Sequence, residues 1–226
     1  MAEYKAVTFD CFGTLIDWKG GQTRVLRQLP SLAEATTNDI KRVIELRGKI
    51  ETEIETGPWM RYSQILEKSI NNAVLQVLDL ELTASESRAF SAGQLGWPPF
   101  PDSVLALEEL VKGKIQIGLL SNCDKSVLER TSRGKLKIPN ALLISSEELQ
   151  SYKPAPAHWG ATLAALQCAP HEILHVSFSS FHDLEPASEL GFSLGFVARY
   201  EEEAPSHLTL SAEAGDLRTL VENILA

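Results

Sequence analysis

The sequence is poor in cysteine and in basic residues, and it has no long hydrophobic run. Its three cysteines, Cys11, Cys123 and Cys168, are odd in number and widely spaced, so neither a disulfide framework nor a clustered zinc or redox motif is expected. No stretch approaches the roughly 20 consecutive apolar residues that cross a bilayer. The N-terminus lacks the basic and apolar segments of a secretory signal. We therefore expect a cytoplasmic protein with reduced thiols and no membrane partner.

Positive charge is also scarce. The chain has 21 lysine and arginine residues against 30 aspartate and glutamate residues, which gives a formal net charge of −9. An acidic surface repels the phosphate backbone, so nucleic acid is not an expected partner. The 226 residues suffice for one hydrophobic core, or for one core with a modest insertion.

Short apolar runs alternate with helical patterns over most of the chain. The runs that predict buried strands are 5–9, 115–120, 141–144, 173–176 and 194–197. The helical patterns lie at about 103–112, 124–132, 156–167, 183–190 and 216–225. Strands that alternate with helices predict an α/β fold with a parallel sheet covered on both faces.

One long segment breaks this alternation. From Trp18 to Leu95 helical periodicity dominates and no clear strand is present. The stiff sequence Gly96-Trp-Pro-Pro-Phe-Pro101 follows it. We therefore predict an α/β core domain of residues 1–17 and 97–226, with residues 18–96 forming a helical cap inserted after the first strand.

Polar residues follow the predicted strands. In open parallel sheets ligands bind beyond the carboxyl ends of the strands, so these residues are the candidate site. Asp10 ends the first strand and precedes the turn residue Gly13. A carboxylate placed there could attack an electrophile and form an ester. It could equally cap the turn through its side chain, and by itself Asp10 does not decide between the two.

Four separated motifs decide in favour of a nucleophile, because together they resemble the haloacid dehalogenase superfamily of aspartate-nucleophile hydrolases. The resemblance runs from about residue 4 to Arg199 and implies a Rossmann-like sheet with a helical cap. In chain order the motifs are Asp10-Cys-Phe-Gly-Thr14, Leu120-Ser121-Asn122, Tyr152-Lys153-Pro154 and His182-Asp183.

The resemblance also implies roles for the motif residues. Catalysis falls to Asp10, Thr14, Lys153 and Asp183. The lysine is expected to lower the pKa of Asp10 and keep it ionised. Substrate binding falls to Ser121, Asn122 and the backbone N–H groups of Cys11 and Phe12. Structural roles are the alternatives. Ser121 and Asn122 could cap the next helix, Lys153 could be a surface lysine, and Asp183 could be favoured by a helix N-terminus.

The residue two positions after the nucleophile narrows the reaction. Phosphatases of this superfamily carry a second aspartate there, which protonates the leaving alkoxide. Phe12 cannot do so, and a halide leaves without a proton. The sequence Phe9-Asp-Cys-Phe-Gly-Thr-Leu15 is similar to that of the type II 2-haloacid dehalogenases. This resemblance implies a small 2-haloacid as substrate and a 2-hydroxy acid as product. The fourth motif has a single acid, Asp183, so we expect no metal and no cofactor.

Two alternatives remain open. One is a phosphatase-like hydrolase that depends on Mg²⁺. The other is a degenerate relative that binds a metabolite or a protein without turnover. Phe178 and Trp159 motivate the latter, because they stand where the haloacid enzymes often carry a polar group and a tyrosine.

The predicted cap contains one charge in an apolar stripe. Arg47 falls among isoleucine and valine residues at helical spacing and needs a partner there. Glu51, four residues on, is one candidate, and a substrate anion or departing halide is the other. Related enzymes are often dimers, so a homodimer is kept open.

Overall fold

The computed structural model describes residues 4–226, which fold into two compact units. The described part of an α/β unit comprises residues 4–17 and Pro99–Ala226, and a helical unit comprises Trp18–Pro98. The first three residues of the predicted 1–17 segment lie outside the described residues.

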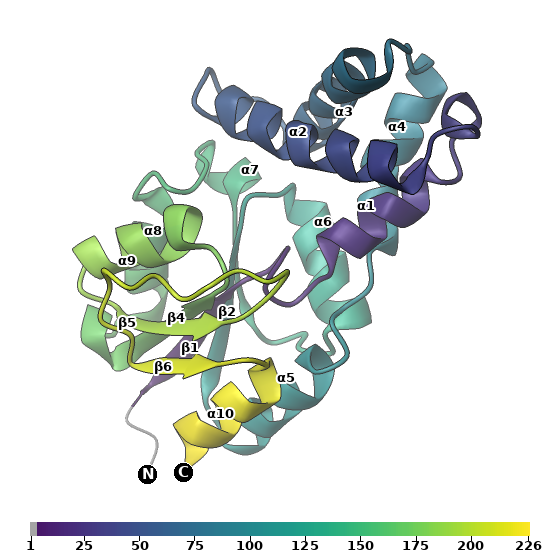
Figure 1. The fold of residues 1–226 in the computed structure, drawn as a ribbon. Helices are drawn as coiled ribbons and strands as arrows, with labels where there is room; N and C mark the ends of the chain where they lie inside the picture. Colours follow the sequence, from purple (N-terminus) through teal and green to yellow (C-terminus); the bar gives the residue numbers. More distant parts are fainter. Residues whose placement is uncertain (1–3) are drawn as a thin grey trace. The chain divides into compact units, whose positions relative to one another are not determined.

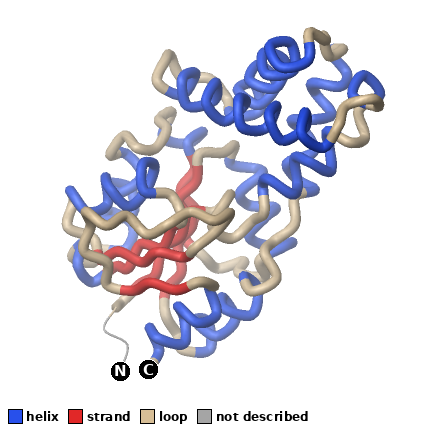
Figure 2. The backbone as a smooth tube through the Cα atoms, viewed as in Figure 1, coloured by secondary structure: helices blue, strands red, loops and turns tan. Residues whose placement is uncertain are grey.

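The α/β unit is built on a six-stranded sheet in the order β3-β2-β1-β4-β5-β6 (Figures 1 and 2). All neighbouring strands are parallel. The predicted fold class, a Rossmann-like α/β sheet with a helical insertion after the first strand, is confirmed. The strands are β1 Ala6–Asp10, β2 Gln116–Ser121, β3 Leu142–Ser145, β4 Ile173–Ser177, β5 Ser193–Val197 and β6 Ala212–Ala214.

Helices cover both faces of this sheet. In Figure 1, α8 and α9 lie on one face, and α5 and α10 lie on the other. The helices are α5 Ser103–Lys112, α6 Lys125–Arg130, α7 Ser146–Leu149, α8 Ala157–Leu166, α9 Glu185–Glu189 and α10 Leu217–Leu225. Two π-helical turns, Thr131–Lys135 and Ser180–Leu184, and one 3₁₀ turn, Pro170–Glu172, complete the unit.

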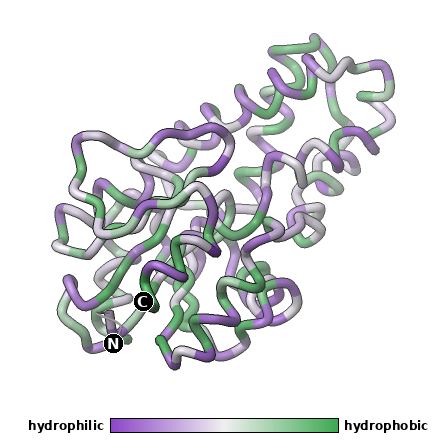
Figure 3. Tube along the Cα trace, turned by 60° about the horizontal axis from the view of Figure 1, so that its bottom comes forward, coloured by the Kyte–Doolittle hydropathy of each residue, from purple (hydrophilic) through white to green (hydrophobic). Residues whose placement is uncertain are grey.

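The hydrophobic core beneath α8 and α9 explains why these segments fold as they do. Hydrophobic and hydrophilic residues alternate along much of the chain (Figure 3). Trp159 and Leu166 of α8 pack with Ala187 of α9 and with the strand residues Ile173 and Phe196. This packing fixes the sheet whose carboxyl ends carry the predicted site residues.

The helical unit contains four α-helices. They are α1 Trp18–Leu26, α2 Thr37–Glu55, α3 Tyr62–Leu78 and α4 Ala84–Ala92, with 3₁₀ turns at Pro30–Leu32 and Gly93–Gly96. Capping boxes start α2 at Thr36 and α4 at Thr83, because each threonine accepts from the backbone of an acid three residues on. Trp97 packs against α1 so closely that a Cβ at Gly21 would lie 2.4 Å from its ring. Among the described helices, none combines the length and the hydropathy that a bilayer crossing demands.

A buried ion pair ties three segments of the α/β unit together. Both terminal nitrogens of Arg199 donate to the carboxylate of Asp102, each at 2.9 Å. The backbone N–H of Leu217, at the start of α10, donates to the same carboxylate at 2.8 Å. Arg199 also stacks over Phe100 at 4.0 Å and donates from Nε to the carbonyl of Thr14. The pair therefore connects the region after β5 to the nucleophile loop.

Removing one partner of the Arg199–Asp102 ion pair should destabilise the protein more than removing one partner of an exposed ion pair. We expect Asp102→Ala to lower the free energy of unfolding by about 2–4 kcal/mol, because it leaves the Arg199 guanidinium buried without its carboxylate. Urea denaturation measures the change. Asp102→Leu combined with Arg199→Met should recover at least half of the loss, since it removes both charges. Breaking the exposed Lys112–Glu109 pair with Glu109→Ala should cost under about 1 kcal/mol.

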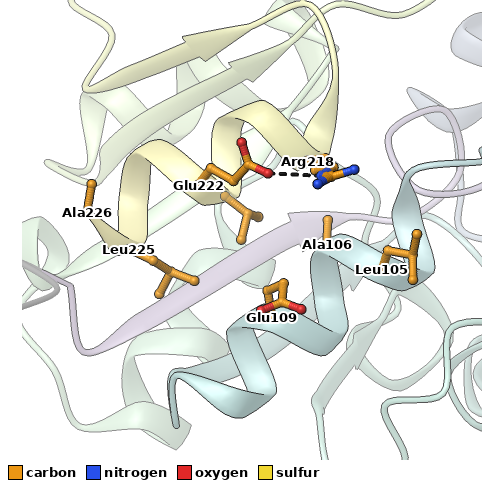
Figure 4. A pocket seen from close by; sticks show the side chains of 8 residues that line it. Leu105, Ala106, Glu109, Arg218, Glu222, Leu225 and Ala226 are labelled. Atoms are coloured by element: carbon orange, nitrogen blue, oxygen red, sulfur yellow. Dashed lines mark hydrogen bonds and ion pairs between the residues drawn. The ribbon is translucent and has the colours of Figure 1, made fainter.

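A surface groove of about 610 Å³ runs between α5 and α10 (Figure 4). Its apolar lining comes from Leu105, Ala106 and Leu225, and Arg218 pairs with Glu222 at its edge. None of the residues that the sequence assigns to the site lines it.

Candidate active site

Asp10 lies at the carboxyl end of the central strand β1, where its backbone pairs with β2. A tight turn follows, in which the carbonyl of Cys11 accepts from the backbone N–H groups of Leu15 and Ile16. Gly13 adopts a φ of 114°, in the positive-φ region that favours glycine. The Asp10 side chain is held at the carboxyl end of the central strand and is only 9% exposed.

Lys153 joins Asp10 to a second carboxylate, Asp183. Its Nζ donates to Asp10 Oδ1 at 2.9 Å and to Asp183 Oδ1 at 2.6 Å. A third bond, of 3.0 Å, goes to the carbonyl of Leu120 at the end of β2. Lys153 is buried, so all three protons of its ammonium group are used within the protein. The structure thus brings together three of the four predicted catalytic residues.

Thr14, the fourth, completes the contacts of Asp10. Its hydroxyl donates to Asp10 Oδ2 at 2.9 Å and accepts from the backbone N–H of Phe178 at 3.3 Å. Both oxygens of Asp10 therefore accept from protein donors, one from Lys153 and one from Thr14. Such bonds fix the direction in which a carboxylate can attack.

Asn122 is engaged with the main chain of Lys153. Its side-chain amide donates to the Lys153 carbonyl at 3.1 Å, and its Oδ1 accepts from the Lys153 N–H at 2.7 Å. This pair of bonds indicates that Asn122 places the lysine, a role that the sequence reasoning did not assign to it. Ser121 ends β2 and is buried one residue beyond the partner of Asp10 in the sheet register.

Asp183 lies in the π-helical turn Ser180–Leu184, which begins where the Ser179 hydroxyl accepts from the N–H of His182. Three side chains donate to it or pair with it. Besides Lys153, Ser177 Oγ donates to Asp183 Oδ2 at 3.1 Å and His175 Nε2 lies 3.1 Å from Oδ1. The sequence motifs assign no role to His175 or Ser177, although Ser177 is among the polar residues that follow the fourth predicted strand. Their period-two spacing on a strand beside β1 was the signal available.

The pKa values of the two carboxylates move in opposite directions. Burial and the nearby Asp183 raise the pKa of Asp10, although the charge of Lys153 acts against them. Burial also acts to raise the pKa of Asp183, but the charge of Lys153 and the bond with His175 outweigh it and hold that pKa below its usual range. Burial opposes ionisation of Lys153, yet the two carboxylates raise its pKa. Lys153 lowers the pKa of Asp10, as expected, but burial and Asp183 outweigh it, so the net shift of that pKa is upward.

These directions predict the pH dependence of turnover. Protonated Asp10 cannot attack, so kcat/KM should fall on the acid side with a pKa above the ordinary 3.8 of aspartate. Because the pKa of Lys153 is raised above 10.5, the lysine should cause no loss up to about pH 10. The pH profile of kcat/KM measures both limits. An alkaline decline that begins near neutrality, or an acid limb at or below the ordinary aspartate value, would contradict this account.

Other residues around the site are packed. Burial raises the pKa of the Cys11 thiol well above its ordinary value, which suits a packing residue. Trp159 is fully buried, with its ring 6.2 Å from that of His175. Phe178 packs edge-on against Tyr200 at 5.8 Å. Burial lowers the pKa of the neighbouring His158 to about 3. Trp159 is a member of the hydrophobic core beneath α8 and α9.

Arg47 belongs to the helical unit, on α2. It is buried and forms an ion pair with Glu51, one of the two partners predicted for it. Tyr62 also donates to Glu51, at 3.1 Å, and the Arg47 guanidinium lies 5.5 Å from the ring of Trp18. Its predicted contact with a substrate anion stays a prediction.

The carboxylates do not form an evident metal site. Within residues 4–226 no group of three or more histidine, cysteine, aspartate or glutamate side chains is arranged to hold an ion. Lys153 Nζ bonds both Asp10 Oδ1 and Asp183 Oδ1 and supplies a positive charge between them. Two carboxylates are a poor donor set for Mg²⁺, which prefers several oxygen ligands in octahedral geometry.

The chain is therefore an α/β protein with two carboxylates, bridged by a lysine, at the carboxyl end of its parallel sheet. The sequence profile of the haloacid dehalogenase-like hydrolases matches residues 4–191. The chain belongs to this family and is a hydrolase, as predicted.

Individual relatives agree with this assignment. The (S)-2-haloacid dehalogenase of Xanthobacter autotrophicus is 27% identical over 219 residues, covering 88% of this chain and 77% of the relative. The (S)-2-haloacid dehalogenase 1 of a Pseudomonas species is 24% identical, covering 98% and 96%. The solved structure of the Xanthobacter L-2-haloacid dehalogenase with chloropropionic acid covalently bound superimposes with a TM-score of 0.81 at 20% identity, covering 98% of both chains.

A magnesium-bound hydrolase of the same superfamily from Bacillus subtilis also shares the fold. Its TM-score is 0.80 at 13% identity, covering 98% of both chains. The fold alone therefore does not decide between chemistries with and without a metal.

Proposed function

We propose that this hydrolase cleaves the carbon–halogen bond of small 2-haloacids, with (S)-enantiomers as the preferred substrates. Asp10 attacks the carbon that bears the halogen, so a carbon–oxygen bond forms and the halide leaves with the bonding electron pair. Water then adds to the carboxyl carbon of the Asp10 ester. The ester and water give the Asp10 carboxylate, a 2-hydroxy acid and a proton.

Phe12 is the observation that carries this proposal. The alkoxide that leaves a phosphate ester needs a proton, and the phenylalanine at this position of the nucleophile loop has none to give. The contacts of Asp10 come from Lys153 and Thr14, which orient the carboxylate for attack. Two relatives carry the name (S)-2-haloacid dehalogenase, and the structure with covalent chloropropionic acid shares the fold.

The remaining site residues receive roles under the same proposal. Lys153 balances the charge of Asp10 and Asp183, while Asp183 orients the hydrolytic water. The backbone N–H groups of Cys11 and Phe12, with Ser121, are expected to hold the substrate carboxylate. Arg47 is expected to meet the departing halide. The reaction needs no metal, in keeping with a lysine between the two carboxylates. The oligomeric state and the location in the cell stay predictions.

Halide release tests the proposal. Purified protein is incubated with (S)- and (R)-2-chloropropionate and their bromo analogues, with and without a chelator, and free halide is measured over time. We expect release from the (S)-compounds at a rate that chelation leaves unchanged.

A panel of phosphate esters with Mg²⁺ serves as the comparison. Cleavage of these esters, abolished by chelation and unaccompanied by halide release, would overturn the proposal in favour of a phosphatase. Binding of haloacids with no turnover of any compound would overturn it in favour of a binding protein.

A further inference from the structure

His175 is a histidine in the middle of a buried central strand. It lies in β4 between Leu174 and Val176, and its side chain has no exposed surface. A buried imidazole costs free energy unless both its nitrogens find partners. His175 Nδ1 lies 3.0 Å from the hydroxyl of Thr8, and Nε2 lies 3.1 Å from Asp183 Oδ1. Both ring nitrogens are therefore paired.

The sheet register places these groups on the same side as the nucleophile. Thr8 of β1 is the register partner of His175 in β4. Asp10 follows Thr8 by two residues, and Ser177 follows His175 by two residues. Side chains two residues apart on a strand point to the same face. Thr8, Asp10, His175 and Ser177 thus form one polar patch beneath the carboxyl end of the sheet.

The contacts define how the ring bears its proton. Asp183 has a lowered pKa and accepts bonds only, so the hydrogen of the imidazole belongs on Nε2. Nδ1 pairs with the Thr8 hydroxyl. The contacts form a chain from Thr8 through His175 to Asp183.

This chain fixes the position of Asp183. Oδ1 of Asp183 accepts from both His175 and Lys153, and Oδ2 accepts from Ser177. Rotation of the carboxylate would break the bond with His175, which comes from the rigid interior of the sheet. His175 makes no hydrogen bond to Asp10, so its influence must act through Asp183.

We propose that His175 is a positioning residue that aligns Asp183 for hydrolysis of the Asp10 ester. The inference rests on the proposed function, since Asp183 orients the water that adds to the ester. Water adds at the Asp10 carboxyl carbon, the bond from that carbon to the product oxygen breaks, and the product oxygen takes a proton. Asp183 is not a reacting group in formation of the ester, so that step should depend on His175 much less than hydrolysis does.

The test separates the two half-reactions. His175→Phe keeps a ring against Trp159 and removes both nitrogens. We expect its steady-state rate with (S)-2-chloropropionate to fall on the order of 10-fold or more, because a misplaced group of this kind costs that much. Intact-mass spectrometry during turnover should show the ester accumulating on the variant, while the initial burst of chloride keeps the wild-type rate.

His175→Gln is the matched variant, because its side-chain amide can donate where Nε2 does. We expect it to recover most of the rate and to remove the accumulated ester. If His175→Phe fails to fold, Thr8→Val replaces it, with a several-fold longer ester lifetime expected.

Each outcome bears on a distinct claim. A wild-type rate without ester accumulation in His175→Phe, or equal slowing of the chloride burst in both His175 variants, would overturn the positioning role. Failure of the wild-type protein itself to release halide or form an ester would overturn the proposed function instead.

Discussion

Replacing Asp10 with asparagine is expected to lower kcat on the order of 10⁴-fold or more, since the amide oxygen is a poor nucleophile and the covalent route closes. The fold should persist, because asparagine keeps the shape of the side chain, and its amide oxygen can still accept from Lys153 while its NH₂ group donates to the Thr14 hydroxyl. Halide release from (S)-2-bromopropionate measures the loss, and thermal unfolding checks the fold.

Asp79→Asn is the matched control for this substitution. Asp79 is exposed at the C-terminus of α3 with a φ of 53°, a conformation that asparagine also adopts readily. It should leave kcat unchanged. An Asp10→Asn protein that retains a tenth of the wild-type rate would show that water attacks the substrate directly, and the nucleophile would have to be sought elsewhere.

Lys153→Met is the second substitution with a large expected effect. Methionine fills the space of the lysine stem but leaves Asp10 and Asp183 buried without their shared cation. We expect a loss of about 3–5 kcal/mol in the free energy of unfolding at neutral pH, together with loss of turnover. Lys68→Met, at an exposed position of α3, should change neither.

The contribution of Asp183 to the stability of this variant should also depend on pH in a direction opposite to its contribution in the wild type. Without the cation, burial and mutual repulsion raise the pKa of the carboxylates above their unfolded values, so the variant loses stability as pH rises through them. In the wild type the pKa of Asp183 is lowered, so its contribution is present above the unfolded pKa and disappears only as pH falls. The difference in Tm between the wild type and Lys153→Met should therefore widen from about pH 4 to pH 7. A gap that stays constant with pH would show that lost packing, not unpaired charge, destabilises the variant.

The fold could be predicted because its main signals are local. Five apolar runs correspond to five observed strands, and the rule that ligands bind beyond strand ends selected Asp10, Lys153 and Asp183 before any contact was known. The sixth strand, Ala212–Ala214, was missed because it has only three residues and an exposed glutamate at its centre. A helix was predicted from residue 183, whereas a π-helical turn occupies Ser180–Leu184 and α9 follows it.

Quantities that depend on the packed environment could not be predicted. The sequence placed Lys153 beside Asp10 and suggested a lowered pKa, but the strength of burial that reverses this direction depends on the surrounding core. The pairing of Thr8 with His175 depends on the register between β1 and β4, which are separated by most of the chain. Asn122 was assigned to substrate, since nothing local shows that its amide faces the backbone of Lys153.

Isotope labelling of Asp10 tests the central claim most directly. The enzyme turns over (S)-2-chloropropionate for several cycles in water enriched in oxygen-18, and the peptide that contains Asp10 is isolated and weighed by mass spectrometry. Hydrolysis of an aspartyl ester at its carboxyl carbon leaves a heavy oxygen in Asp10, so the account predicts label in that residue. In a single turnover with excess enzyme, the label should again be found in Asp10 and be absent from the hydroxyl of the product. Label in the product hydroxyl with none in Asp10 would contradict the account, because it would mean that water displaces the halide without a covalent intermediate.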